Sequence, residues 1–310
     1  MSTPTLAPIP APKDVAAQSS SRGSRASRAG SSTGPNARPN PIGIIIGAVV
    51  IIGVFVAPYV VMLLGSLKTQ AEITKIPPPY GLPSGPHFDN YVDVWSSSVA
   101  PLNGLIATVV ISVGATLLVL LVATPAAYYL ARFRFPGRLA FLLLVLITQM
   151  LQPTVLAIGL FNEFKSWTGH GSWAALILVN GAFNLAFAIW IMQAFFASIP
   201  KEIDEAAVVD GAGRFQVLFK ISLPLVWPGI VTAVVFVFVN SWNEYAAASV
   251  LVQDNALQPL TVSLPKFFGL YIKDWQYVFA VATVAIVPVV ILFGFIEKRL
   301  IGGLTAGAVK

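Results

Sequence analysis

Hydrophobic residues in this chain fall into six long runs, and charged residues are confined to the segments between them. Each run exceeds 20 residues and lacks Asp, Glu, Lys and Arg; the six are Pro41–Leu67, Gly104–Ala131, Leu139–Asn162, Gly171–Pro200, Ile221–Asn243 and Trp275–Ile296. About 20 consecutive apolar residues suffice for a helix to cross the hydrocarbon core of a bilayer. The pattern therefore predicts an all-α membrane protein with six transmembrane helices.

Composition points the same way. Of the 310 residues, 56% are hydrophobic and only 10% are charged, and the mean hydropathy is +0.78. Soluble domains carry about 25% charged residues, so most of this surface is expected to face lipid rather than water. Membrane barrel strands would alternate polar and apolar residues, whereas long uninterrupted runs satisfy their backbone hydrogen bonds only as helices.

The basic residues predict the orientation. With the N-terminus inside the cell, 14 of the 19 Lys and Arg residues lie in cytoplasmic segments, as the positive-inside rule requires. The inverted topology would place the most basic segments outside, and we reject it. We therefore expect a multi-pass protein of the cell membrane with both termini in the cytoplasm.

Three regions follow from this pattern. Residues 1–40 are rich in Ser, Pro, Ala and Gly, a composition typical of a disordered tail. Residues 41–300 contain the six predicted spans, and residues 301–310 form a short C-terminal tail. Between the first two spans, the proline-rich segment Lys68–Asn103 predicts an extended loop.

Several kinds of chemistry have no support in this sequence. There is no cysteine, and His87 and His170 are not spaced as a metal site. The phosphate-binding pattern G-x-x-x-x-G-K-[ST] is absent, so the chain has no means of its own to cradle a nucleotide. The net charge of +6 is explained by membrane topology rather than by nucleic acid. We therefore expect a subunit that is not an enzyme and holds no cofactor or metal.

One loop, residues 198–225, is long and carries proline, acidic, glycine and aromatic residues in a distinct order. Its first part predicts a short helix with Pro200 in the first turn and acidic residues near its positive end. Gly211 and Gly213 predict a sharp turn. A second helix follows, with Phe215, Leu218, Phe219 and Ser222 on one face and Pro224 as its stop. Such a thin helix–turn–helix suits docking into a groove on a soluble partner, although any loop between membrane helices can form an amphipathic surface helix.

The residues of this loop resemble a known motif. Glu205-Ala206-Ala207, Asp210-Gly211-Ala212 and Ile221-x-Leu223-Pro224 are similar to the "EAA…G…I-LP" loop of permeases in binding-protein-dependent ABC importers. Further stretches resemble the sugar-importer branch, and the second, smaller permease of maltose-type importers is the nearest likeness; these stretches are Ser66-Leu67-Lys68-Thr69 with Glu72, Asp89-Asn90-Tyr91, Ala131–Arg138, Phe195–Pro200, Trp242-Asn243-Glu244 and Gly303–Lys310. The first forty residues have no counterpart in that pattern.

The resemblance implies a type I importer permease fold and a division of labour. A second homologous permease would complete a path for a carbohydrate, expected to be an oligosaccharide or a disaccharide. An extracytoplasmic sugar-binding protein would deliver the solute, and a separate dimer of ATPase subunits would bind ATP and Mg. The 198–225 loop would couple that ATPase to the path through Glu205, Ala206, Ala207, Asp210, Gly211, Ala212, Ile221, Leu223 and Pro224.

Polar residues inside the apolar runs are candidates for the solute path. Polar groups in a membrane are costly unless they find partners, so they are expected to face the bundle interior or a water-filled cavity. The candidates are Gln152, Asn184, Asn240, Asn243 and Glu244, with Gln149 and Asn180 beside them. The alternative is that each residue serves as a polar contact between helices.

Two other transporter classes stay open at this point. An ion-driven secondary transporter usually carries carboxylates inside its spans, and here only Glu244 lies near one, at its edge. A permease of the same superfamily for glycerol-3-phosphate or another polar solute would want a buried arginine for the phosphate. The runs contain none, but a partner subunit could supply it.

Overall fold

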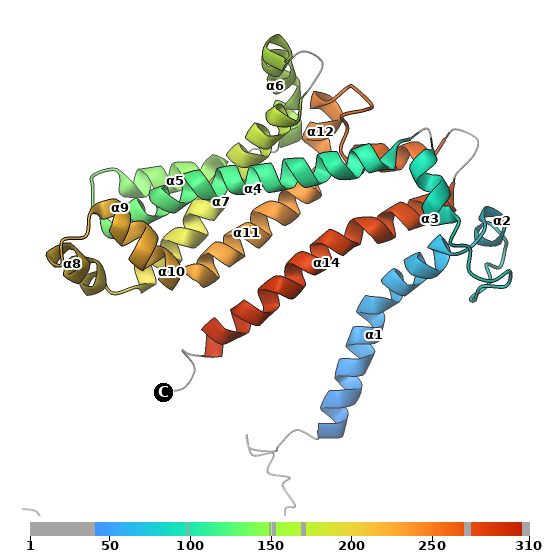
Figure 1. Ribbon diagram of the computed structural model, residues 1–310, viewed down its shortest axis with the longest axis horizontal. Coiled ribbons are helices and arrows are strands. Elements are labelled where there is room, and N and C mark those ends of the chain that lie inside the picture. Colours follow the sequence, from blue (N-terminus) through green and yellow to red (C-terminus); the bar gives the residue numbers. More distant parts are fainter. Residues whose placement is uncertain are drawn as a thin grey trace, which may run out of the picture. The chain divides into compact units, whose positions relative to one another are not determined.

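The computed structural model describes residues 41–97, 99–148, 150, 153–168, 172–269 and 274–305, and every regular element within these ranges is helical. Four helices are long: α1 (Pro41–Ser66), α4 (Pro101–Arg132), α7 (Trp173–Ser198) and α14 (Trp275–Thr305) (Figure 1). The shorter ones are α2 (Gln70–Ile73), α3 (Asn90–Asp93), η1 (Val94–Ser96), α5 (Arg138–Thr148), α6 (Pro153–Thr168), α8 (Lys201–Val209), α9 (Arg214–Gln216), η2 (Val217–Ser222), α10 (Leu223–Leu225), α11 (Trp227–Trp242), α12 (Ala246–Leu251), α13 (Leu260–Ser263) and η3 (Leu264–Phe267).

The helical membrane class is confirmed. Among the described residues, four helices are long and apolar enough to cross a bilayer, within α1, α4, α7 and α14. A fifth span is possible if the segment Arg214–Leu225 and the helix Trp227–Trp242, which meet at 81°, count as one. The six-span count stays a prediction.

The predicted third span, Leu139–Asn162, is divided between two helices. Helix α5 ends at Thr148 and α6 begins at Pro153. Proline lacks an N–H and fits the first turn of a helix, where that donor has no partner in any case. At 11 and 16 residues, each helix is shorter than the length of about 20 residues that a span needs.

The chain divides after Gly53 into two units. In the first unit the structure describes only the opening turns of α1, and the predicted tail of residues 1–40 lies outside the described residues. All the packing described below belongs to the second unit, Val54–Lys310. There α14 continues to Thr305, into the predicted C-terminal tail.

Helices α4, α7 and α11 pack side by side and form the main core (Figure 1). Small residues line their contacts, and Ala123, Ala127, Ala188 and Ala233 are fully buried. Small side chains let helix backbones approach closely, and close packing drives association in lipid, where apolar burial alone gives little. Gly229 of α11 marks one such approach, since a Cβ atom there would lie within 2.5 to 2.8 Å of the Phe195 side chain.

A second apolar cluster joins α12 and α13 to the first halves of α4 and α7. Polar bonds fix it. Thr108 of α4 accepts a hydrogen bond from the Leu260 amide at 2.8 Å and donates to the Gly104 carbonyl at 2.8 Å. Trp173 donates its indole N–H to the Leu257 carbonyl at 2.8 Å. The segment between α11 and α14 is thereby held against the bundle.

The segment after α1 is folded rather than extended, so the prediction of an extended loop was wrong there. The Asn90 side-chain amide donates to the carbonyls of Ser66 (2.9 Å) and Lys68 (3.0 Å), and the hydroxyls of Ser66 and Tyr91 lie 2.6 Å apart. These are residues of two stretches that carry the family resemblance, twenty residues apart in sequence. The structure brings them together as a structural clasp.

Glu72 completes this clasp. Its carboxylate accepts hydrogen bonds from the Thr69 amide (3.1 Å), the Ser84 amide (3.0 Å) and the Ser84 hydroxyl (2.6 Å). Thr69 and Glu72 form a capping box on α2. The bonds from Ser84 and then from Thr69 favour the charged form and lower the pKa of Glu72 below its ordinary value of 4.5.

Candidate functional site

The 198–225 loop begins with the thin helix predicted for it. Pro200 precedes α8, and Asp210 ends it. Gly211 follows at φ +88°, a conformation that residues with a side chain rarely adopt. The predicted turn is therefore present at Gly211. Gly213, at φ −68°, has no such backbone requirement and stands after the turn as the N-cap of α9.

Helix α8 turns two residues inward and most of the others outward. Asp204 and Ala207 are buried, whereas Glu205 and Ala206 are exposed. Beyond them Val208, Val209 and Phe215 are 55%, 86% and 77% exposed. The outer surface of this helix–turn–helix thus combines exposed carboxylates, from Glu202, Glu205 and Asp210, with large apolar side chains, a composition suited to a protein contact.

The second half of the loop departs from a regular helix. Between α9 and α10, residues Val217–Ser222 form a π-helix, η2, and single π-turns often mark functional sites. Leu218 and Ser222 point inward, whereas Phe215 and Phe219 are exposed, so the prediction that all four share one face was wrong. The wider π-turn shifts the register of side chains that a 3.6-residue period would align.

The motif residues of this second half lie at the bend into α11. Ile221 and Leu223 are half-buried, and Pro224 is exposed. The segment ending at Leu225 meets α11 at 81°. The helical segment runs through Pro224 to Leu225, so the predicted stop at Pro224 was wrong by one residue. In the first half, Asp210 and Ala212 flank Gly211, and the Ala212 amide bonds the Ala207 carbonyl at 3.0 Å.

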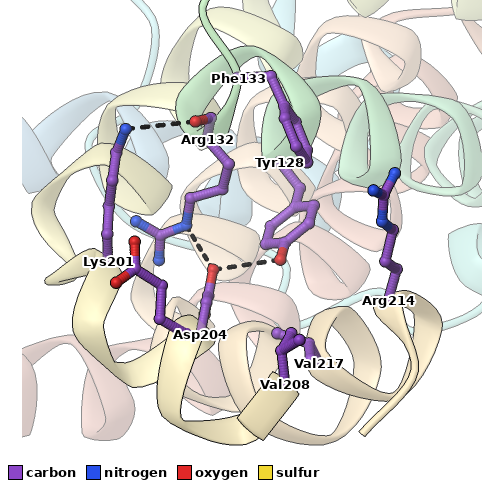
Figure 2. Close-up of a pocket in the computed structure, with 9 residues that line it drawn as sticks. Tyr128, Arg132, Phe133, Lys201, Asp204, Val208, Arg214 and Val217 are labelled. Atoms are coloured by element: carbon purple, nitrogen blue, oxygen red, sulfur yellow. Dashed lines mark hydrogen bonds and ion pairs between the residues drawn. The ribbon is translucent and has the colours of Figure 1, made fainter.

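A buried carboxylate holds this loop to the bundle. Arg132, the last residue of α4, places its Nε 2.6 Å from Oδ2 of Asp204, and the two side chains are only 6% and 12% exposed. Tyr128 donates its hydroxyl to the same oxygen at 3.1 Å (Figure 2), and Ser222 donates to Oδ1 at 2.8 Å. Asp204 therefore bonds α4 and η2 at once.

Arg132 also bonds the start of the loop. Its Nη1 donates to the Ile199 carbonyl at 2.8 Å, and Lys201 donates to the Arg132 carbonyl at 3.3 Å. We refer to Tyr128, Arg132, Asp204 and Ser222 as the Asp204 cluster. Sequence analysis missed it, because it took Asp204 only as a favourable charge near a helix N-terminus. The available signal was that Asp204 lies three residues before Ala207, on the same face of α8.

A pocket of about 380 Å³ opens beside this cluster (Figure 2). Its walls come from the end of α4 and from both halves of the loop; the lining residues are Tyr128, Arg132, Phe133, Lys201, Asp204, Glu205, Val208, Arg214 and Val217. Glu205 is thus the motif residue that stands at its rim. The pocket separates part of α8 from α4, so long polar side chains bridge the two helices.

A second pocket, of about 730 Å³, involves the predicted path. Trp242 and Asn243 at the end of α11 line it together with Tyr59, Thr108 and Thr261. The remaining lining is apolar, from α1, η3, α13 and α14. Aromatic rings beside hydroxyl and amide groups are the surfaces that sugars bind.

The other path candidates do not line this pocket. Asn184 is buried in α7 and donates to the Asn180 carbonyl at 2.8 Å, while Asn180 donates to Leu176 at 3.0 Å. Asn240 is exposed and bonds the Phe236 carbonyl. Gln149 and Gln152 lie outside the described residues. Of the candidates that the structure describes, it brings Asn243 to this pocket.

Glu244 has a structural partner. Its carboxylate accepts the Ala247 amide at 2.6 Å, at the start of α12, and its carbonyl accepts the Thr261 hydroxyl at 2.6 Å. It thereby stabilises the first turn of α12. Within the part of the chain that the structure describes, no group of three His, Asp or Glu side chains could hold a metal ion.

Comparison with known proteins decides the family. A family model described as "Binding-protein-dependent transport system inner membrane component" matches residues 120–304, more than half of the chain. The chain belongs to this family. It is accordingly a transport permease of the inner membrane rather than an enzyme.

Curated relatives are similar to this permease over most of their length. The sulfoquinovosyl glycerol transport system permease protein SmoH of Agrobacterium fabrum is 34% identical, over 82% of this chain and 88% of that protein. The melibiose/raffinose/stachyose import permease protein MelC of Bacillus subtilis is 31% identical, over 82% of this chain and 91% of that protein.

A solved structure confirms the fold of the permease. A chain of a bacterial ABC transporter that imports the acidic polysaccharide alginate superposes with a TM-score of 0.69 at 24% identity, covering 84% of this chain and 98% of that one. At this identity the likeness concerns the fold alone. The importer permease fold predicted from the 198–225 loop is therefore present.

Proposed function

We propose that this permease forms, with a second homologous permease, a membrane path for a carbohydrate of the oligosaccharide or disaccharide class. Family membership supports the transport role. The named solutes of its relatives support the class, since SmoH is named for a sulfoquinovosyl glycerol and MelC for melibiose, raffinose and stachyose. Trp242 and Asn243 in the larger pocket supply the kinds of group that bind sugar hydroxyls and ring faces.

The energy for transport would come from a separate ATPase that holds ATP and Mg. We propose that it docks on the outer surface of the 198–225 loop, through Glu205, Ala206, Ala207 and the Asp210-Gly211-Ala212 turn. The observation that carries this proposal is the exposed apolar surface of α8 and α9 around Glu205. An extracytoplasmic binding protein would deliver the solute on the opposite face, and both termini would lie in the cytoplasm with the loop.

Reconstitution tests this function. Vesicles containing this permease, its partner permease, the ATPase and the binding protein should take up sugar only when ATP is present. The purified permease alone should hydrolyse no ATP. Uptake that follows an ion gradient without ATP would overturn the proposal, and uptake of glycerol-3-phosphate in place of sugar would reassign the solute.

One substitution addresses the docking surface. Glu205→Ala should lower co-purification of the ATPase with the permease pair, because it removes an exposed carboxylate beside the apolar side chains of the proposed docking surface. Asp254→Ala provides a matched control, since Asp254 is an exposed acid far along the chain whose side chain bonds only its own turn at Ala256. Equal ATPase recovery in both variants would argue against docking at Glu205.

A further inference from the structure

The Asp204 cluster is the place where the loop and the membrane bundle are joined by charged groups. Arg132 is the last residue of α4, which packs against both α7 and α11 in the main core. Asp204 lies one helical turn into α8. Through these two side chains the docking helix is tied directly to the helix at the centre of the bundle.

The geometry makes this tie stiff. The ion pair is short at 2.6 Å and nearly closed to water, so it is poorly screened. Both carboxylate oxygens are occupied, because Tyr128 and Ser222 donate to Oδ2 and Oδ1. A buried carboxylate with several partners in fixed directions has few ways to move independently of them.

Apart from the Asp204 cluster, the packing of α8 involves mainly η2. Ala207, buried in α8, has a side chain of one carbon, and the neighbour against which α8 packs is η2. Towards α4, the pocket of about 380 Å³ lies between the elements. The polar contacts described between them are the Arg132–Asp204 ion pair, the hydrogen bond from Tyr128 to Asp204 and the hydrogen bond from Lys201 to the Arg132 carbonyl. Movement of α8 would therefore reach α4 mainly through the ion pair.

We infer that the Arg132–Asp204 ion pair is the positioning element that transmits motion of the docked loop to α4, so that ATP hydrolysis and solute movement stay coupled. The inference rests on the proposed ATPase docking and adds a transmission point outside the docking surface. Neither residue belongs to the exposed surface that would contact the ATPase. Loss of the pair should thus lower the sugar taken up per ATP while the ATPase is retained, whereas loss of docking would abolish both ATPase retention and uptake.

The experiment uses the complete transporter in vesicles and measures two quantities, ATPase recovery on purification and sugar taken up per ATP hydrolysed. Asp204→Asn removes the charge and keeps a side chain of nearly the same shape, whose one oxygen can still accept the Ser222 hydroxyl and whose amide N–H can donate to the Tyr128 oxygen. Arg132→Met removes the partner charge and keeps most of the length. Both variants should retain the ATPase, and uptake per ATP should fall at least fivefold.

Tyr128→Phe is the control within the cluster. It deletes one hydroxyl and leaves the ion pair in place, so uptake per ATP should stay within twofold of the unaltered complex. Parallel loss of ATPase recovery and uptake in Asp204→Asn and Arg132→Met would mean that the pair only stabilises the fold. That result, or normal uptake per ATP in both, would overturn the inference.

A cross-link separates transmission from stability. Because the chain has no cysteine, the double variant Arg132→Cys/Asp204→Cys can be bridged with a short bismaleimide, and each single variant serves as the unbridged control. Uptake per ATP should be low before bridging and recover at least threefold afterwards, in the double variant only. No recovery would contradict transmission through this point. Failure of the proposed function itself would appear differently, as absent ATP-dependent uptake in the unaltered complex.

Discussion

At the residue scale, Gly211 and Gly213, two positions apart in the loop, show that backbone conformation rather than space constrains the sequence there. A Cβ atom on Gly211 or on Gly213 would have no neighbour within 4 Å, yet only Gly211 has a positive φ, of +88°. Any side chain at Gly211 therefore costs backbone strain on the order of 1 kcal/mol, and one at Gly213 does not.

We predict that Gly211→Asp inserts in the membrane and assembles with the partner permease but loses ATPase association or coupled hydrolysis. The turn would relax, and Asp210 and Ala212 would leave the positions in which they flank the exposed surface. Gly213→Asp carries the same charge without the backbone cost and should co-purify the ATPase nearly as well as the unaltered chain. Equal loss in both variants would assign the effect to charge, and normal coupling in Gly211→Asp would remove the loop from the mechanism.

A second prediction concerns Asn243 and Asn240. Both are on α11, both are exposed, and both donate at 2.8 Å to a carbonyl four residues earlier, but only Asn243 lines the larger pocket. Asn243→Ala should therefore weaken solute handling, with a rise in the KM of uptake of several-fold, since one hydrogen bond contributes about 0.5–1.5 kcal/mol. Asn240→Ala should leave the KM unchanged, and equal effects in the two would argue against this pocket as the path.

At the element scale, the sequence predicted well what depends on local pattern. The apolar runs correspond to helices, the thin α8 and the turn at Gly211 are present, and the motif residues sit at the predicted bends. The Arg132–Asp204 pair escaped prediction because its members lie 72 positions apart and neither one is unusual within its own segment. The π-turn of η2 escaped because a hydropathy pattern reflects side-chain polarity, not the hydrogen-bond pattern of a helix.

The clasp after α1 gives a pH-dependent prediction at this scale. The pKa of Glu72 is lowered by its bonds from Ser84 and Thr69, so the charged carboxylate stabilises the fold. Its contribution is fully present above the ordinary value of 4.5 and is lost as the pH falls below 4.5 through the lowered pKa. The protection factor of the Ser84 amide, which corrects its exchange rate for the pH dependence of intrinsic exchange, should fall over that acidic range. In Glu72→Gln this acid-dependent loss of protection should be absent, and its persistence would place the titrating group elsewhere.

At the scale of the whole molecule, the orientation of the permease is the property most open to a direct test. The chain lacks cysteine, so a single introduced thiol can be labelled in intact cells with an impermeant reagent. Gly81→Cys should be labelled and Pro136→Cys protected. Both positions are exposed, and a Cβ atom at Gly81 meets nothing within 4 Å. Ser84, although exposed, is a poorer reporter because its hydroxyl bonds Glu72. The reverse labelling pattern would invert the topology.

The turn at Gly211 also has a consequence that concerns chirality. Open space surrounds this residue, and its φ of +88° is the mirror image of what ordinary residues prefer. A D-alanine introduced there by chemical ligation should therefore fit without strain and, by restricting the unfolded chain, stabilise the turn relative to glycine. The L enantiomer, identical in size and polarity, should weaken it. The position selects for handedness alone.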